Sequence, residues 1–217
     1  MEGERAIRQL LPGRRQEIME IVAVTSMSGK FPGLPLRVLE KTQFDSISAE
    51  KTPQGIAALV RLPSHVYSDK LPPLPGRRVL LLEHIQDPGN AGTLIRSAAA
   101  LDYDGVIMSD KCADPFSPKA VQSSAGSLLS LWIRRSAGYL NLAGELRGKG
   151  FKLIAAALEG EHDMKPLLGH KTVLALGNEA AGLSGKILRM ADYRVKIPIN
   201  RQKAESLNAA TSGAILM

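Results

Sequence analysis

The spacing of apolar residues along the last two thirds of the chain predicts strands and helices in alternation. Short continuous apolar runs are typical of buried strands, whereas apolar residues three and four positions apart are typical of helices. The predicted strands are Val79–Glu83, Gly105–Met108, Leu128–Ile133, Lys152–Ala157, Thr172–Leu176 and Tyr193–Ile197. The predicted helices are Asn90–Leu101, Pro118–Ser127, Tyr139–Gly148 and Ser206–Met217. This alternation predicts an α/β domain with a mostly parallel sheet.

A proline-rich stretch precedes this domain. Four of the residues between 63 and 77 are prolines, which remove backbone donors and disfavour helix, so we expect an extended linker there. The linker divides the chain into residues 1–62 and residues 78–217. In the shorter part we predict strands at Ile18–Val24 and Ile56–Arg61, and a short strand or the start of a helix at Leu36–Leu39. About sixty residues make a thin core, so we expect this part to lean on the second domain or on another chain.

Composition narrows the class of partner. The chain of 217 residues is 44% hydrophobic and carries a formal net charge of +7, with an isoelectric point of about 9.6. A basic surface suits a polyanion such as RNA, although a basic protein with no nucleic-acid role would have the same charge. Aromatic residues make up only 4% of the chain, which argues against recognition of single strands by a row of stacked aromatic rings.

Several kinds of site and location are disfavoured. The single cysteine, Cys112, allows neither an intramolecular disulfide nor a thiolate zinc site. His162 and His170 are close in sequence, but no third ligand stands near them, so we predict no metal site. No apolar stretch is long enough to span a bilayer. The charged segment Met1–Arg15 lacks the apolar core of a signal peptide, so we expect a cytoplasmic location.

The first of three strand-to-helix junctions runs from Glu83 to Arg96. Asp87-Pro88-Gly89 is a turn signal, and Asn90 is predicted to cap the helix that follows. Arg96 comes less than two turns later and could reach back to the same end of the sheet. Taken alone, these residues favour a turn, a helix cap and a solvated arginine over a functional site.

The second junction follows the strand Thr172–Leu176. Gly177 and Gly182 leave the backbone open to a ligand, and Glu179 places a carboxylate at the mouth of a buried strand. The junction lacks both the GxGxxG fingerprint and the GK[ST] of a phosphate-binding loop, which disfavours a dinucleotide-dependent oxidoreductase. A glycine turn with a solvated glutamate is the alternative.

The third junction follows the strand Tyr193–Ile197, which stops at Pro198. A polar loop comes next, and Glu205 or Ser206 is predicted to start the last helix. Leu207, Ala210, Ala214 and Ile215 are expected on one stripe of that helix. Small residues make the helix slim, so it can pack close to a neighbour, as an ordinary C-terminal amphipathic helix would.

In this order, the three junctions resemble the motifs of the SpoU/TrmH family of RNA ribose 2′-O-methyltransferases, within the SPOUT superfamily. The first resembles N-x-G-x-x-x-R, the second G-x-E-x-x-G, and the third an I-P…S-L-N signature. The matching residues are Asn90, Gly92 and Arg96; Gly177, Glu179 and Gly182; and Ile197, Pro198, Ser206, Leu207 and Asn208. The resemblance covers roughly residues 78–217.

The resemblance implies an S-adenosylmethionine-dependent enzyme that methylates a ribose 2′-hydroxyl of ribosomal or transfer RNA. Family members bind the methyl donor in a C-terminal trefoil knot and are usually homodimers whose active site is completed across the interface. The catalytic residues that the resemblance implies are Asn90, Arg96, Glu179, Ser206 and Asn208. The residues it implies for the donor are Gly177, Asn178, Gly182, Ile197 and Leu207.

Arg96 is the base that the resemblance suggests, but its chemistry favours another role. A guanidinium is essentially always protonated, so it suits bidentate binding of the adjacent phosphate better than removal of a proton. Glu179, Ser206 and Asn208 are then expected to hold Arg96 and the ribose.

Residues 1–62 resemble the end of a ribosomal-protein-L30e-like RNA-binding domain that is shorter than usual, as though its opening strand and helix were absent. The loop Asn200–Lys203 also departs from the family, being one residue longer and without the frequent glycine. The alternative function is a non-catalytic RNA-binding protein that keeps the knotted fold. The last helix has about three turns and is marginal unless it docks, and relatives extend it beyond Met217.

Overall fold

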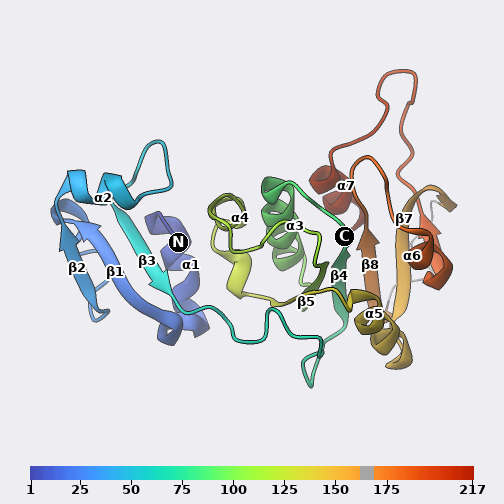
Figure 1. Cartoon of the computed structure of the whole chain (residues 1–217), viewed down its shortest axis with the longest axis horizontal. Helices are drawn as coiled ribbons and strands as arrows, with labels where there is room; N and C mark the ends of the chain where they lie inside the picture. The colour runs from blue at the N-terminus through green and yellow to red at the C-terminus, as the bar shows by residue number, and fades with distance from the viewer. Residues whose placement is uncertain (162–168) are drawn as a thin grey trace.

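The computed structural model describes residues 1–161 and 169–217, which form two separate sheets (Figure 1). The smaller sheet has strand order β2-β1-β3, built from β1 (Ile18–Val24), β2 (Leu36–Leu39) and β3 (Ile56–Val60). The larger sheet has order β6-β5-β4-β8-β7-β9, and every strand pairing within it is parallel. The predicted α/β class with a mostly parallel sheet is confirmed.

The larger sheet is covered by helices on both faces. Its strands are β4 (Arg78–Leu82), β5 (Gly105–Ser109), β6 (Trp132–Ser136), β7 (Lys152–Glu161), β8 (Thr172–Leu176) and β9 (Tyr193–Val195). Its helices are α3 (Pro88–Ala100), α4 (Pro118–Ser124), α5 (Tyr139–Gly148), α6 (Gly185–Met190) and α7 (Ala209–Leu216).

Alternation along the central strand β4 accounts for the layers. Leu80 and Leu82 enter a core shared with α3 and α7, whereas Val79 and Leu81 enter a second core shared with α5 and α6. Because successive side chains of a strand point to opposite faces, a continuous apolar run indicates burial on both sides.

The small sheet carries two helices that the sequence pattern did not predict, α1 (Glu4–Arg14) and α2 (Lys41–Ile47). The side chains of Ile7 and Leu10 on α1 pack in the core of this sheet. A short 3-10 helix of the larger domain, Ser127–Leu129, contributes Leu129 to the same core. The small sheet therefore leans on the larger domain, as its thin core predicts.

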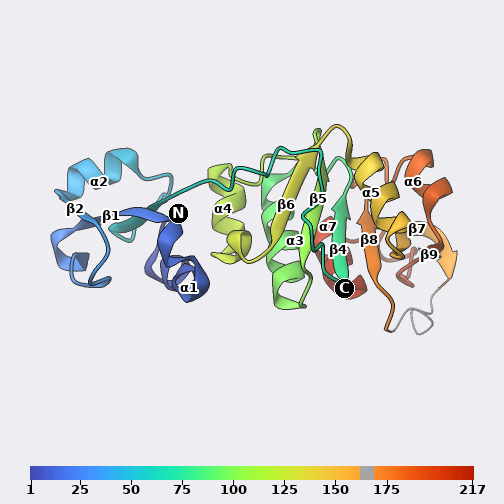
Figure 2. The same ribbon diagram turned by 90° about the horizontal axis from the view of Figure 1, so that it is seen from below.

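Residues 63–77 contain neither helix nor strand, as predicted, but they are not a free tether (Figure 2). They run alongside β6, the edge strand of the large sheet. The backbone N–H of Arg135 donates to the carbonyl of Val66 at 2.7 Å, and the Trp132 indole N–H donates to the carbonyl of Pro75 at 3.2 Å. This stretch thus covers part of an edge that would otherwise be open to pairing with another chain, and it occupies the backbone N–H of Arg135.

The strand predicted at Leu128–Ile133 was placed too early. The structure has a 3-10 helix at Ser127–Leu129 and begins β6 at Trp132. Gly126, with φ of 90°, turns the chain before that helix, and the apolar pair Leu128 and Leu129 is buried in two different cores. The apolar run therefore correctly indicated burial of these residues, but they do not form a strand.

The last helix begins later than predicted and buries a different face. α7 starts at Ala209, so Glu205 and Ser206 lie before it. Of the predicted stripe, Ala210 is buried, whereas Ala214 and Ile215 are exposed. Gly213 is the other buried residue, because its face of α7 packs against α3 and β8. The short helix α6 was not predicted at all.

Gly213→Ala is expected to destabilise the fold. A Cβ at this position would come within 2.3 Å of Leu94 Cδ2 and 2.8 Å of Leu176 Cδ1, so the core must shift. Overpacking of this kind costs about 1–3 kcal/mol, enough to lower the melting temperature measurably. Thermal unfolding followed by circular dichroism measures it, and a variant as stable as wild type would show that α7 is not docked tightly.

Candidate functional site

The three sequence motifs meet at the carboxyl ends of neighbouring strands. β4 and β8 are adjacent in the sheet, so the loop that begins at Glu83 lies beside the loop that begins at Gly177. The third segment leaves β9 at the sheet edge and returns to α7, which packs on α3 (Figure 1). In open parallel sheets, ligands bind beyond the carboxyl ends of the strands, so this end is the candidate site.

The loop after β8 folds tightly back on itself. Asn178 and Gly182 exchange two backbone hydrogen bonds of 3.1 and 2.8 Å. The Asn178 carboxamide oxygen accepts from the N–H groups of Ala180 and Ala181, both at 3.0 Å. A Cβ on Gly177 would lie 2.2 Å from the backbone carbon of Gly182. Gly177 is therefore required for the shape of the loop, and not only for access by a ligand.

Hydrogen bonds made by two side chains connect the loop after β4 to the loop after β8. The Asn178 side-chain N–H donates to the carbonyl of His84 at 3.0 Å. The Glu83 carboxylate accepts hydrogen bonds from the hydroxyl and the backbone N–H of Ser184, at 2.7 and 2.6 Å. Neither Glu83 nor Ser184 was predicted as a site residue from the sequence. The one indication was that Glu83 places a carboxylate directly after a continuous apolar run.

One hydrogen-bonded chain joins all three motifs. Asn90 Nδ2 donates to Glu179 Oε1 at 2.8 Å, and Asn208 Nδ2 donates to Asn90 Oδ1 at 3.0 Å. Asn208 is also the N-cap of α7, since its Oδ1 accepts from the N–H groups of Ala210 and Thr211. Three residues that are far apart in sequence thus present amide and carboxylate groups at one place.

Asn90 does not cap α3, contrary to the sequence prediction. Asp87 is the cap, and its carboxylate accepts the backbone N–H of Asn90 at 2.8 Å. The ion pair with Lys119 and then the bond to Asn90 hold the pKa of Asp87 below its usual value. Pro88 occupies the first turn, where its missing N–H costs nothing. The Asn90 side chain is therefore left to contact Glu179 and Asn208.

Arg96 lies on a different side of α3 from Asn90. It follows Gly92 by one turn, and Gly92 faces α4, where a Cβ would come 2.3 Å from the carbonyl oxygen of Ala120. Asn90 is instead one turn before Leu94, which packs against α7. Arg96 is exposed and makes no hydrogen bond or ion pair with the described residues. Glu179 and Asn208 contact Asn90 and not Arg96, contrary to expectation.

Ser206 also stays outside the hydrogen-bonded chain. It is exposed, precedes α7, and makes no hydrogen bond with residues 1–161 or 169–217. Ile197 and Leu207 are half-buried, and neither contributes to a backbone–backbone hydrogen bond within those residues. Their main-chain donors and acceptors therefore have no backbone partner among the described residues.

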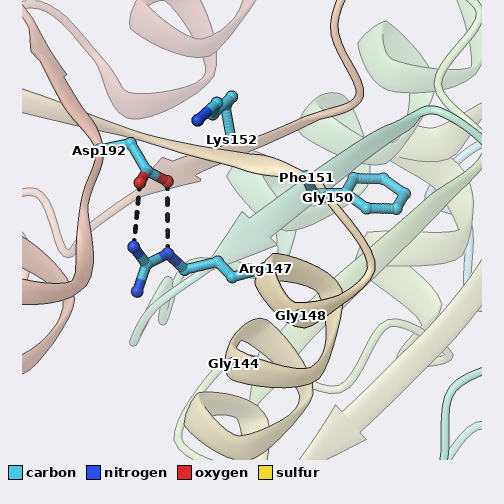
Figure 3. A pocket seen from close by; sticks show the side chains of 7 residues that line it. All are labelled: Gly144, Arg147, Gly148, Gly150, Phe151, Lys152 and Asp192. Carbon is cyan, nitrogen blue, oxygen red and sulfur yellow. Dashed lines mark hydrogen bonds and ion pairs between the residues drawn. The ribbon is translucent and has the colours of Figure 1, made fainter.

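Two cavities lie at the other end of the sheet. One, of about 430 Å³, is lined by α5 and by the starts of β7 and β9, where Arg147 forms an ion pair of 2.9 Å with Asp192 (Figure 3). The other, of about 290 Å³, lies beside Arg77 and Asp104. Both are at the amino ends of the strands, so they are separate from the motif residues. The Arg147–Asp192 pair has an evident structural use, since it ties α5 to β9.

Residues 1–161 and 169–217 contain no group of three His, Cys, Asp or Glu side chains that could hold a metal ion. His162 lies outside the described residues. No described helix is both long and apolar enough to cross a bilayer.

Comparison with known proteins gives consistent matches. The model of the SpoU rRNA methylase family matches residues 77–217. The chain is 33% identical over 222 residues to the 23S rRNA (guanosine(2553)-2′-O)-methyltransferase RlmP of Bacillus subtilis, covering 100% of this chain and 86% of that relative.

Solved structures agree over the whole chain. A TrmH-family protein from Porphyromonas gingivalis superposes with a TM-score of 0.85 at 30% identity, covering 100% of this chain and 86% of the other. The SpoU methyltransferase AviRb of Streptomyces viridochromogenes, in complex with the cofactor AdoMet, gives a TM-score of 0.82 at 26% identity. That match also covers 100% of this chain and 86% of the other.

Proposed function

Because the chain belongs to the SpoU rRNA methylase family, we propose that it methylates a ribose 2′-hydroxyl of ribosomal RNA with S-adenosylmethionine as donor. The enzyme class is that of S-adenosylmethionine-dependent RNA 2′-O-methyltransferases. Ribosomal RNA is favoured over transfer RNA because the Bacillus subtilis relative, which spans the whole chain, is named as a 23S rRNA enzyme. The hydrogen-bonded chain Glu179–Asn90–Asn208 carries the proposal, since it joins all three motifs at one place.

The loops at this place suit S-adenosylmethionine. Gly177 sits where a Cβ would collide with the loop's own return, so the loop presents backbone there and no side chain. Ile197 and Leu207 add half-buried main-chain groups that have no backbone partner among the described residues. Rigid backbone donors and acceptors of this kind suit an adenine ring and an amino-acid group. We therefore assign Gly177, Asn178, Gly182, Ile197 and Leu207 to the donor site.

The donor supplies an electrophilic methyl group, and the residues of the chain must prepare the ribose. A 2′-hydroxyl is a poor nucleophile at neutral pH, so it requires positioning and removal of its proton. We assign Asn90, Glu179 and Asn208 to hold the ribose, with Ser206 on the nearby loop as a further candidate. The fork of Arg96 is assigned to the adjacent phosphate, which it can bind through two parallel hydrogen bonds.

A homodimer accounts for the position of Arg96. Within one chain, Arg96 is on a different side of α3 from Asn90, so it would have to serve a site that another subunit completes. We propose a two-fold dimer in which each site combines the donor loop of one protomer with Arg96 of its partner. The C-terminal trefoil knot that holds the donor in relatives is part of the same proposal.

The small sheet is proposed as the RNA substrate-binding domain. Residues 1–62 would form this L30e-like domain, residues 63–77 the linker, and residues 78–217 the methyltransferase domain. The net charge of +7 favours association with the phosphate backbone of RNA. Because its proposed substrate is RNA, we place the enzyme in the cytoplasm.

Asn208→Asp tests the link between the motifs without removing the helix cap. Aspartate still accepts from the N–H groups of Ala210 and Thr211, but it cannot donate to Asn90, and it adds a charge near Glu179. We expect methyl transfer about tenfold slower, with a melting temperature close to wild type.

Asn208→Ala is the matched variant. It removes both the link to Asn90 and the cap, so it should also lose about 1 kcal/mol of stability. Steady-state transfer rates and thermal melts of the two variants separate these effects. An Asn208→Asp enzyme as active as wild type would mean that the link to Asn90 has no part in the reaction.

Transfer of a radiolabelled methyl group to purified ribosomal and transfer RNA tests the proposed substrate. We expect label in ribosomal RNA taken from cells that lack the enzyme, and little in transfer RNA. Label mainly in transfer RNA would reverse the assignment. A protein that binds the donor and RNA but labels neither would support a non-catalytic RNA-binding role.

A further inference from the structure

Glu83 is a buried carboxylate for which the proposed function has no role. It follows β4, and only 1% of its surface is exposed. It accepts hydrogen bonds from the Tyr139 hydroxyl at 2.5 Å, the Ser184 hydroxyl at 2.7 Å and the Ser184 N–H at 2.6 Å. None of the ion pairs among the described residues includes it.

Stability alone is a poor reason for a carboxylate in this position. Removing a charged group from water is costly, and the three hydrogen bonds from Tyr139 and Ser184 only offset that cost. Burial and the bond to Glu83 raise the pKa of Tyr139, so its phenol stays protonated and donates. The Tyr139 and Ser184 groups supply hydrogen bonds to the carboxylate. In return, the carboxylate fixes the position of these donors.

The donor that matters most is Ser184, at the returning end of the loop after β8. The outgoing end of that loop is also tied to Glu83, because the Glu83 N–H donates to the carbonyl of Leu176 at 2.9 Å. One residue therefore holds both ends of the loop, the first through its backbone and the second through its side chain. Between those ends lies the tight turn of Gly177–Gly182.

We propose that Glu83 is a positioning residue for the methyl donor. It fixes Ser184, and through Ser184 it fixes the return of the loop against which the Gly177 backbone is packed. The carboxylate acts through the loop and does not itself touch the donor. This inference rests on the proposed function, because the loop is assigned to the donor there. It predicts that loss of the carboxylate weakens donor binding, whereas loss of the Tyr139 hydroxyl weakens the fold alone.

Glu83→Met and Glu83→Gln distinguish positioning from charge. Methionine has a similar volume but removes the acceptors for all three hydrogen bonds, so we expect donor affinity at least about tenfold weaker. Glutamine can accept the Ser184 N–H with its oxygen and donate its amide N–H groups to the two hydroxyls, which can also accept. We expect its donor affinity to stay within about threefold of wild type.

Tyr139→Phe is the matched control. It removes one hydrogen bond from the same carboxylate, but the lost donor is on α5 and not on the loop. We expect it to lower the melting temperature while donor affinity stays within about twofold of wild type. Glu83→Met is expected to lower the melting temperature as well, because the Tyr139 and Ser184 donors lose their acceptor, but of the two variants it alone weakens donor binding.

Isothermal titration with S-adenosylmethionine and thermal melts without it test the inference on the full chain. Weakened binding in Glu83→Met, restored in Glu83→Gln, supports it. Equal donor affinity in Glu83→Met and wild type overturns it, as does equal weakening by Tyr139→Phe and Glu83→Met. A wild-type protein that binds no donor would instead overturn the proposed function itself, and with it the role of Glu83.

Discussion

Arg96→Ala is expected to abolish methyl transfer, with a loss of about 100-fold or more, while S-adenosylmethionine binding stays within about threefold of wild type. The reason is its location. Arg96 lies on a different side of α3 from the Glu179–Asn90–Asn208 chain, and it makes no hydrogen bond or ion pair with the donor loop among the described residues. A guanidinium is a poor proton acceptor, so loss of Arg96 removes a phosphate-binding fork and not a base. Single-turnover transfer and donor titration measure the two quantities separately.

Arg96→Lys is the control for charge. It keeps the cation but loses the planar fork, so transfer is expected to fall between wild type and Arg96→Ala. Because Arg96 is exposed, neither substitution should alter the melting temperature. Turnover at the wild-type rate in Arg96→Ala would remove Arg96 from the reaction altogether.

Mixed dimers test whether Arg96 serves the partner's site. Subunits carrying Arg96→Ala are combined with subunits whose donor loop is disabled by Gly177→Ala. If each site takes Arg96 from its partner, half of the dimers are mixed and each has one intact site, which gives about a quarter of wild-type activity. If Arg96 serves its own chain, no mixed dimer has an intact site, and activity stays at the level of the separate variants.

Gly177→Ala is expected to weaken S-adenosylmethionine binding by at least about tenfold. A Cβ there would lie 2.2 Å from the backbone carbon of Gly182 and 2.4 Å from the backbone nitrogen of Leu183. Both contacts are with backbone, which cannot rotate away as a side chain can. The paired hydrogen bonds between Asn178 and Gly182 must therefore break or shift, and the loop loses the shape that presents its backbone to the donor.

Gly144→Ala is the matched control, because its Cβ would meet no atom within 4 Å. It lies inside α5, where alanine is the better helix former, so we expect equal or higher stability and unchanged donor binding. Calorimetric titration and circular dichroism of both variants make the comparison. Wild-type donor affinity in Gly177→Ala would show that the loop does not contribute to the donor site.

The sequence pattern predicted the elements whose burial is continuous. The strand β8 and the helix α5 were predicted with the bounds that the structure has, because a run of buried side chains or an apolar stripe extends along each whole element. Three helices were missed. α6 has six residues and α2 has seven, too few for a clear periodic pattern, and α1 is interrupted by Pro12 and Gly13. The strand β6 was predicted too early in the chain because the buried residues Leu128 and Leu129 belong to a 3-10 helix.

The sequence predicted which residues form the site, but not which hydrogen bonds join them. The motif order identified Asn90, Glu179 and Asn208, and the structure brings these three together. Their hydrogen bonds depend on the α3 cap, which sequence preference assigned to Asn90 although Asp87 fills it. Glu83 was missed because a single charged residue after an apolar run gives no indication of which groups will surround it.

The position of the transferred methyl group shows most clearly whether the enzyme methylates a ribose 2′-hydroxyl. The enzyme is incubated with ribosomal RNA from cells that lack it and with S-adenosylmethionine carrying an isotopic label in the methyl group. The RNA is then digested to nucleosides and separated by mass. We expect the label on a ribose, as a 2′-O-methylnucleoside resistant to alkaline cleavage at its 3′ side. Label on a base, or none in any nucleoside while the donor is bound, would contradict the proposed function.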